Sequence, residues 1–117
     1  MKKIYYLSTC DTCKRILNEL KPLHDFQLQD IKTEAISKEQ LNEMKKLSGS
    51  YVDLFSKRAR LFKERGLGTK TLSENDYKNL ILEHYTFLKR PVILFNDKIF
   101  IGNSKKLVEA AKENIHS

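Results

Sequence analysis

Near its amino end the chain reads Ile4-Tyr5-Tyr6-Leu7-Ser8-Thr9-Cys10-Asp11-Thr12-Cys13, with two cysteines directly after a short apolar run. The apolar run predicts a buried strand over residues 2–7, and the spacing of the apolar residues after it predicts a helix over residues 11–20. A strand that leads into a helix places Cys10 at the helix amino end. Unpaired N–H groups and the helix dipole favour a thiolate there.

The two cysteines are the only ones in the chain, and their spacing has three interpretations. They are a redox pair, two small buried hydrophobic residues, or half of a zinc site. Structural zinc needs four ligands, and the only histidines, His24, His84 and His116, are far apart in the sequence. We favour the redox pair and expect no metal, because the motif follows a strand and opens a helix.

The positions of the two sulfurs predict different roles. Cys10 lies at the exposed turn and is expected to be the nucleophile, whereas Cys13, one helical turn later, is expected to be the shielded resolving thiol. Asp11 opposes a thiolate at Cys10, and Lys14 and Arg15 favour one. The sequence leaves that balance open.

Length and cysteine content restrict the class of protein. A chain of 117 residues, 40% of them apolar, predicts a single domain over residues 1–117. Two cysteines across a tight turn do not make a secreted disulfide scaffold. No apolar stretch is long enough for a signal sequence or a membrane span, so we expect a cytoplasmic protein with reduced thiols and no membrane partner.

The formal net charge is +7, from 22 Lys and Arg against 15 Asp and Glu. Solvated helix faces account for scattered basic residues, and attraction to an anion is the alternative. Such an anion is either small, like an oxyanion or glutathione, or large, like a nucleic acid. No basic block with interleaved aromatic residues occurs, so direct nucleic-acid binding is not expected.

Alternation of apolar residues predicts a second strand over residues 26–31, which gives a strand–helix–strand unit with parallel strands. Three helices are predicted next. One follows the capping box at Ser37–Gln40, one runs from about Val52 to Arg65, and one begins at Ser73.

The last part of the chain predicts a β-hairpin and a final helix. Val92–Phe95 and Lys98–Ile101 are apolar runs joined by the two-residue turn Asn96-Asp97. Gly102-Asn103-Ser104 then begins the last helix. The order βαβ, helices, ββα is that of an α/β thioredoxin-like (glutaredoxin-like) fold with a helical insertion at about residues 35–88.

Two arginines and a proline outside the cysteine motif are further candidates. Pro91 opens the first hairpin strand, where thioredoxin-like folds commonly have a cis proline that faces the reactive cysteine; an ordinary strand-opening proline is the alternative. Arg90 precedes this proline, and Arg58 lies within the predicted insertion. By spacing alone, Arg58 is one exposed arginine among several.

Three stretches together resemble the glutaredoxin-linked arsenate reductase (ArsC-like) family, which includes the Spx-type transcriptional regulators. They are Tyr5–Lys14, Leu54–Glu64 and Phe87–Ile93, and the resemblance covers nearly the full length. It implies a thioredoxin-like fold, a cytoplasmic location and thiol-based redox function. In the family's reductases a cysteine attacks the oxyanion and arginines hold it.

The resemblance assigns the attacking cysteine to Cys10 and anion-holding arginines to Arg58 and Arg90. Arginine offers a fixed fork of donors to a tetrahedral oxyanion. The stretch Ile101–Ser104 lacks the third arginine of the arsenate reductases. These reductases also usually lack the second cysteine, so the presence of Cys13 resembles the Spx-type proteins instead.

Two functions therefore remain. The first is a thiol-dependent oxidoreductase acting on an oxyanion, a glutathione mixed disulfide or a protein disulfide. No flavin, nicotinamide or metal motif occurs, so glutathione or a partner thiol protein is the expected electron donor. The alternative is a redox-sensing regulator that binds RNA polymerase, with Cys10 and Cys13 as its switch.

Overall fold

The computed structural model describes residues 1–117, which fall into two compact units. The sheet unit comprises Met1–Glu34 and Arg90–Ser117, and the helical unit comprises Ala35–Lys89. The prediction of a single domain over residues 1–117 stays a prediction, and each unit is described by itself.

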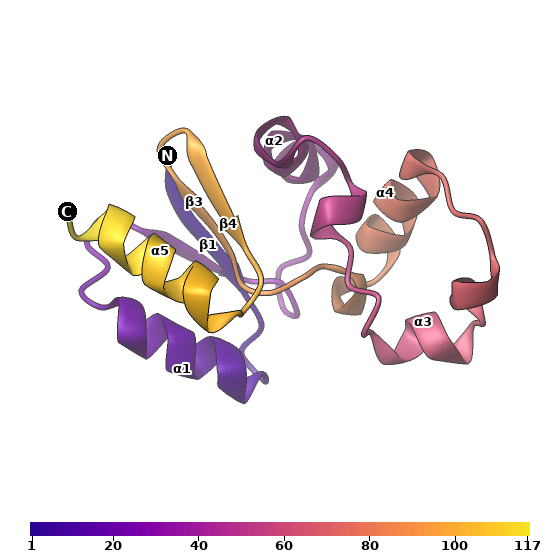
Figure 1. Ribbon diagram of the computed structural model, residues 1–117, viewed down its shortest axis with the longest axis horizontal. Helices are drawn as coiled ribbons and strands as arrows, with labels where there is room; N and C mark the ends of the chain where they lie inside the picture. The colour runs from indigo at the N-terminus through magenta and orange to yellow at the C-terminus, as the bar shows by residue number, and fades with distance from the viewer. The chain divides into compact units, whose positions relative to one another are not determined.

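The sheet unit contains a four-stranded sheet in the order β2-β1-β3-β4 (Figure 1). Its strands are β1 (Lys2–Tyr6), β2 (Gln27–Asp30), β3 (Val92–Phe95) and β4 (Lys98–Ile101). β1 pairs in parallel with β2 and antiparallel with β3, and β3 pairs antiparallel with β4. The predicted parallel pair and hairpin are both confirmed.

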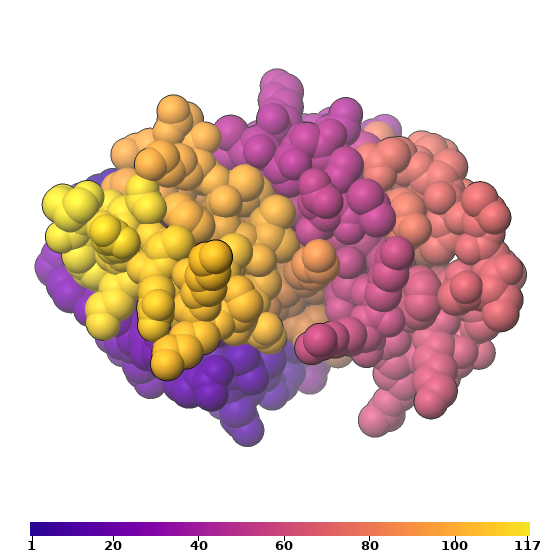
Figure 2. All heavy atoms as spheres, viewed as in Figure 1, coloured from indigo at the N-terminus to yellow at the C-terminus, as the bar shows by residue number.

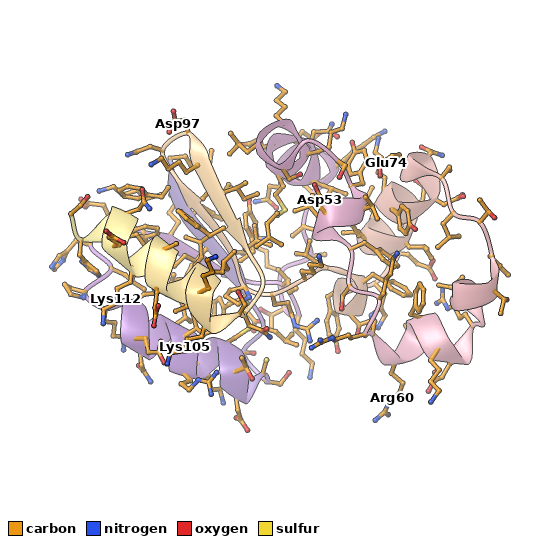
Figure 3. The ribbon with its side chains drawn as sticks, viewed as in Figure 1. Asp53, Arg60, Glu74, Asp97, Lys105 and Lys112 are labelled. Carbon is orange, nitrogen blue, oxygen red and sulfur yellow. The ribbon has the colours of Figure 1, made fainter.

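Two helices of the sheet unit, α1 (Asp11–Leu20) and α5 (Lys105–Ile115), pack side by side against the sheet (Figure 1). Their apolar sides and the sheet form one core of buried residues: Ile4, Ile16, Leu20, Ile93, Val108 and Ala111. The outer side of α5 faces solvent in the space-filling view (Figure 2). Lys105 and Lys112 project from it (Figure 3). The amphipathic pattern of both helices thus matches their placement.

The hairpin turn follows the chemistry of its residues. Asn96 has a φ of 57°, in the left-handed region that asparagine tolerates better than most residues. Asp97 lies beside it at the tip of the hairpin (Figure 3). Ser104 accepts a hydrogen bond from the Leu107 N–H and caps α5 as predicted.

The helical unit contains three α-helices, α2 (Lys38–Ser48), α3 (Arg60–Glu64) and α4 (Glu74–Glu83). Short 3₁₀ turns accompany them: η1 (Val52–Leu54), η2 (Leu67–Thr69) and η3 (Tyr85–Phe87). Complete capping boxes begin α2 and α4, with Ser37 paired to Gln40 and Ser73 to Asp76. The predicted starts of both helices are confirmed.

The predicted helix from about Val52 to Arg65 is wrong. The segment forms η1, then an extended stretch, and only then the short helix α3. Phe55 makes an isolated antiparallel bridge with Leu88, and the Ser56 N–H donates to the Phe87 carbonyl at 2.8 Å. These backbone groups form hydrogen bonds with a segment that is distant in sequence. The local helical pattern of apolar residues therefore does not decide the conformation of this stretch.

Aromatic packing stabilises the extended stretch between η1 and α3. Phe55 is 1% exposed and stacks on Phe87 with ring centroids 5.3 Å apart. Its ring centroid also lies 4.8 Å from that of Tyr77 and 5.8 Å from that of Phe62, whose ring is arranged edge-to-face with it. The Phe55 side chain, which directly follows η1, therefore contacts α3, α4 and η3.

Replacing Phe55 by alanine should lower the free energy of unfolding of the helical unit by about 3–5 kcal/mol, because the variant loses apolar contacts and leaves a cavity. Hydrogen exchange resolved by peptide should show the loss within residues 35–89. Phe55→Leu is the control and should lose clearly less. Equal stability of the alanine variant and the parent would contradict the central position of this ring.

Candidate thiol redox site

Cys10 occupies the position just before α1, with extended backbone angles of φ −97° and ψ 113°. Its N–H donates to the Leu7 carbonyl at 3.0 Å, which closes a tight turn over Leu7–Cys10, here called the cysteine turn. Its own carbonyl accepts from the Lys14 N–H at 3.2 Å as the helix begins. The end of β1 thus delivers Cys10 to the helix amino end, as predicted.

The environment of Cys10 favours its thiolate. Burial by itself raises the pKa of this half-buried thiol, but several groups outweigh it and hold the pKa below its ordinary value. They are hydrogen bonds from the backbone and thiol of Cys13, the positive charge of Arg90 and the backbone N–H of Thr12. The lowered pKa thus comes from Cys13, Arg90 and Thr12, and not from the Asp11, Lys14 and Arg15 charges weighed from the sequence.

Cys13 has the opposite character. Its side chain is fully buried, and burial is the main cause that raises its pKa to about 11. A backbone hydrogen bond with Leu7 and the charge of Arg90 lower it in part, whereas the neighbouring Cys10 raises it further. Near neutral pH Cys13 is consequently a protonated thiol beside a more acidic one. Both cysteines are unpaired in this structure.

The pairing of β3 with β1 places Arg90 and Pro91 near the end of β1, where the cysteine turn begins. β3 begins directly after Pro91, and Val92 pairs with Tyr5 of β1. Pro91 is buried and its carbonyl accepts from the Gly102 N–H at 2.9 Å. The Arg90–Pro91 peptide is cis, as predicted. Arg90 is half-buried, and its charge acts on both sulfurs.

Arg58 belongs to the helical unit. It is exposed in the segment between η1 and α3, next to the buried Ala59. Arg60 follows at the start of α3 and projects away from the helix (Figure 3). The expectation that Arg58 meets Cys10 stays a prediction.

Asp30 is a residue of this region that sequence reasoning missed. It ends β2 and pairs with Tyr6, so its carboxylate lies beside the start of the cysteine turn. The Ser8 N–H donates to its Oδ1 at 3.2 Å. A polar residue at the carboxyl end of a strand predicted to be parallel to β1 was the available signal.

No three or more His, Cys, Asp or Glu side chains lie together in an arrangement that could hold a metal ion. None of the helices combines the length and the apolar character that a membrane crossing requires.

A comparison with known families matches the ArsC family over residues 5–111. Since this covers most of the chain, the protein belongs to the ArsC family. The predicted family and the α/β thioredoxin-like fold are thereby confirmed.

Relatives within the family carry more than one description. The global transcriptional regulator Spx 2 of Bacillus anthracis is 24% identical, over 87% of this chain and 79% of that protein. The regulatory protein MgsR of Bacillus subtilis is 25% identical, over 93% of this chain and 89% of its own length. Among solved structures, an arsenate reductase from Vibrio cholerae matches with a TM-score of 0.77 and 21% identity, over 96% and 95% of the two chains. The chain is thus similar in sequence to proteins described as regulators, and in fold to a structure described as an arsenate reductase.

The two sulfurs are expected to react at different rates. Cys10 should react with iodoacetamide faster than Cys13 at pH 7, because its pKa is lowered and its side chain is accessible, whereas Cys13 is buried with a pKa of about 11. Peptide mass analysis after timed labelling measures both rates. Equal or reversed rates would remove Cys10 as the nucleophile.

Arg90 is expected to control the reactivity of Cys10, because its charge lowers the pKa of that thiol. In Arg90→Ala the pKa of Cys10 should rise, so the alkylation profile should shift to higher pH and the rate at pH 7 should fall several-fold. Arg90→Lys retains the charge and should stay nearer the parent. Lys112→Ala removes an exposed charge from α5 of the same unit and serves as the control. An unshifted profile in the alanine variant would show that Arg90 does not act on the thiolate.

Proposed function

We propose that this protein is a thiol-dependent oxidoreductase in which Cys10 and Cys13 cycle between dithiol and disulfide. The main support is the unequal environment of the two sulfurs. Cys10 is accessible and its pKa is lowered, while the pKa of the buried Cys13 is raised to about 11. Cys10 is therefore suited to be the nucleophile, and Cys13 is suited to be the resolving thiol that reacts second.

The proposed reaction begins with the Cys10 thiolate attacking one sulfur of a substrate disulfide. A bond forms between Cys10 Sγ and that sulfur, and the other substrate sulfur leaves as a thiolate. Cys13 then loses its proton and attacks Cys10 Sγ, which releases the second thiol. Two electrons pass to the substrate and leave a Cys10–Cys13 disulfide, which glutathione or a partner thiol protein reduces.

The two steps are coupled through charge. While Cys10 is a thiolate, its charge and its hydrogen bond with Cys13 raise the pKa of Cys13. Both effects end when Cys10 becomes part of a mixed disulfide, so the pKa of Cys13 falls at the moment when it has to attack. The charge of Arg90 also favours a Cys13 thiolate.

The composition of the site favours a sulfur substrate over arsenate. A tetrahedral oxyanion calls for several convergent donors, and the stretch Ile101–Ser104 has no arginine. Arg90 acts on the sulfurs within the sheet unit. We therefore place a glutathione mixed disulfide or a protein disulfide ahead of an oxyanion as the substrate, and the cytoplasm as the place of action.

A second function has its own support. The related proteins of Bacillus anthracis and Bacillus subtilis are described as regulators, and the second cysteine, Cys13, resembles the Spx-type arrangement. In this function a Cys10–Cys13 disulfide, formed on oxidation, would change the local surface of a protein that binds RNA polymerase. The chemistry at Cys10 would then act as a switch without turnover.

The experiment that tests the proposal follows thiol loss in the reduced protein with three separate oxidants: arsenate, a glutathionylated peptide and a protein disulfide. A sulfur substrate should consume both protein thiols and give the Cys10–Cys13 disulfide. Cys13→Ser should stop after the first step and accumulate a mixed disulfide at Cys10, and Cys10→Ser should not react. Repeated turnover with added glutathione or a dithiol protein supports an enzyme.

A pull-down with purified RNA polymerase separates the alternative. Binding that appears only in the oxidised protein, together with a single oxidation and no turnover with any donor, would replace the enzyme by the regulator. Reaction with arsenate alone would overturn the choice of a sulfur substrate.

A further inference from the structure

Asp30 forms a cluster of hydrogen bonds at the end of β2. Its Oδ1 accepts from the N–H groups of Ser8 and Lys32, both at 3.2 Å, and the Thr33 hydroxyl donates to its Oδ2 at 3.4 Å. The Lys32 and Thr33 bonds are local, whereas the Ser8 bond joins segments 22 residues apart. That long-range bond connects Asp30 to the cysteine turn.

We propose that Asp30 is a positioning residue for the Cys10–Cys13 pair, because its carboxylate fixes the cysteine turn through the backbone of Ser8. Since Cys10 is taken as the nucleophile, this role rests on the proposed function. Asp30 acts through the backbone and does not itself react.

The cysteine turn is held at both of its ends. The Ile31 N–H donates to the Tyr6 carbonyl at 2.9 Å, which continues the pairing of β1 and β2 up to the turn. At the other end, the Cys10 N–H donates to the Leu7 carbonyl at 3.0 Å. Ser8 lies between these two bonds, and Asp30 supplies the acceptor for its N–H.

The position of this turn affects both sulfurs. The pKa of Cys10 is lowered by N–H groups of α1, whose first residue follows the turn directly. Cys13 forms a backbone hydrogen bond with Leu7, the first residue of the turn. A displaced turn would therefore weaken the contacts that make the two thiols unequal.

The Asp30 carboxylate is charged at neutral pH. A hydrogen bond from the Ser8 hydroxyl is the largest effect, and together with backbone bonds from Ser8 and Lys32 it holds the pKa of Asp30 below its ordinary value. A charged acceptor makes a stronger hydrogen bond to an N–H group than a neutral one does.

A direct effect of the charge predicts the opposite sign. A negative charge close to Cys10 would raise the pKa of that thiol, so its removal would make Cys10 more reactive. Removal of a positioning acceptor makes Cys10 less reactive. The sign of the change thus separates the two roles of Asp30.

The test compares Asp30→Ala with Asp30→Asn by the pH profile of Cys10 alkylation. Alanine removes the acceptor, so the profile should move to higher pH and the rate at pH 7 should fall several-fold. The Asn side-chain oxygen can still accept from Ser8, so this variant should remain within about twofold of the parent. Glu109→Gln, on the exposed side of α5, controls for the change in net charge.

Two results would overturn the proposal. Faster alkylation in both Asp30 variants would mean that its charge acts directly on Cys10. An unchanged profile in a folded Asp30→Ala protein would mean that Asp30 only stabilises the fold.

A measurement on the parent protein covers the case in which Asp30→Ala does not fold. The amide proton of Ser8 should titrate in NMR spectra together with the Asp30 carboxyl carbon, and an independent course would overturn the contact. Neither readout needs a substrate. A confirmed role of Asp30 with no turnover of any disulfide would therefore refute the enzyme and leave the positioning role standing.

Discussion

The pairing of β1 with its two neighbours is the constraint on which the thiol site depends. In register, Tyr6 lies opposite Asp30 of β2, and Tyr5 lies opposite Val92 of β3. Because β2 is parallel to β1 and β3 is antiparallel, the end of β2 and the start of β3 meet the end of β1 at one edge. The cysteine turn follows β1, Asp30 ends β2, and Arg90 lies just before β3. A shift in register would therefore separate all three.

The position of the two cysteines after the end of β1 also explains why their pKa values differ. Cys10 precedes α1 and is half-buried, whereas Cys13 is one turn into the helix and completely buried. Burial acts against the charge of both, but only Cys10 has enough compensating donors to lower its pKa. The asymmetry that a dithiol needs thus arises from position along one helix, with Arg90 as an added charge from a distant segment.

Sequence reasoning succeeded where the signal was local. The capping box at Ser37 and the hairpin turn at Asn96 each depend on residues within a few positions, and both are present. The helix expected from Val52 to Arg65 failed because the bridge between Phe55 and Leu88 joins distant segments. Asp30 was missed for the same reason, since its hydrogen bond with Ser8 depends on the register of β1 and β2.

The choice between enzyme and regulator lies beyond the sulfur chemistry, because both need an acidic Cys10 and a buried Cys13 that can close a disulfide. They differ in the fate of that disulfide. An enzyme must let a reductant reach the Cys10–Cys13 bond repeatedly, whereas a switch must keep that bond long enough for a partner to bind.

The half-buried position of Cys10 leaves one sulfur of the pair open to an incoming thiol. Attack at that sulfur releases Cys13 as a thiolate into a buried position, and burial is the main cause that raises the pKa of Cys13. A leaving thiol of high pKa leaves slowly. In the proposed reaction the charge of Arg90, which lowers the pKa of Cys13, therefore assists reduction of the disulfide as well as attack by Cys13.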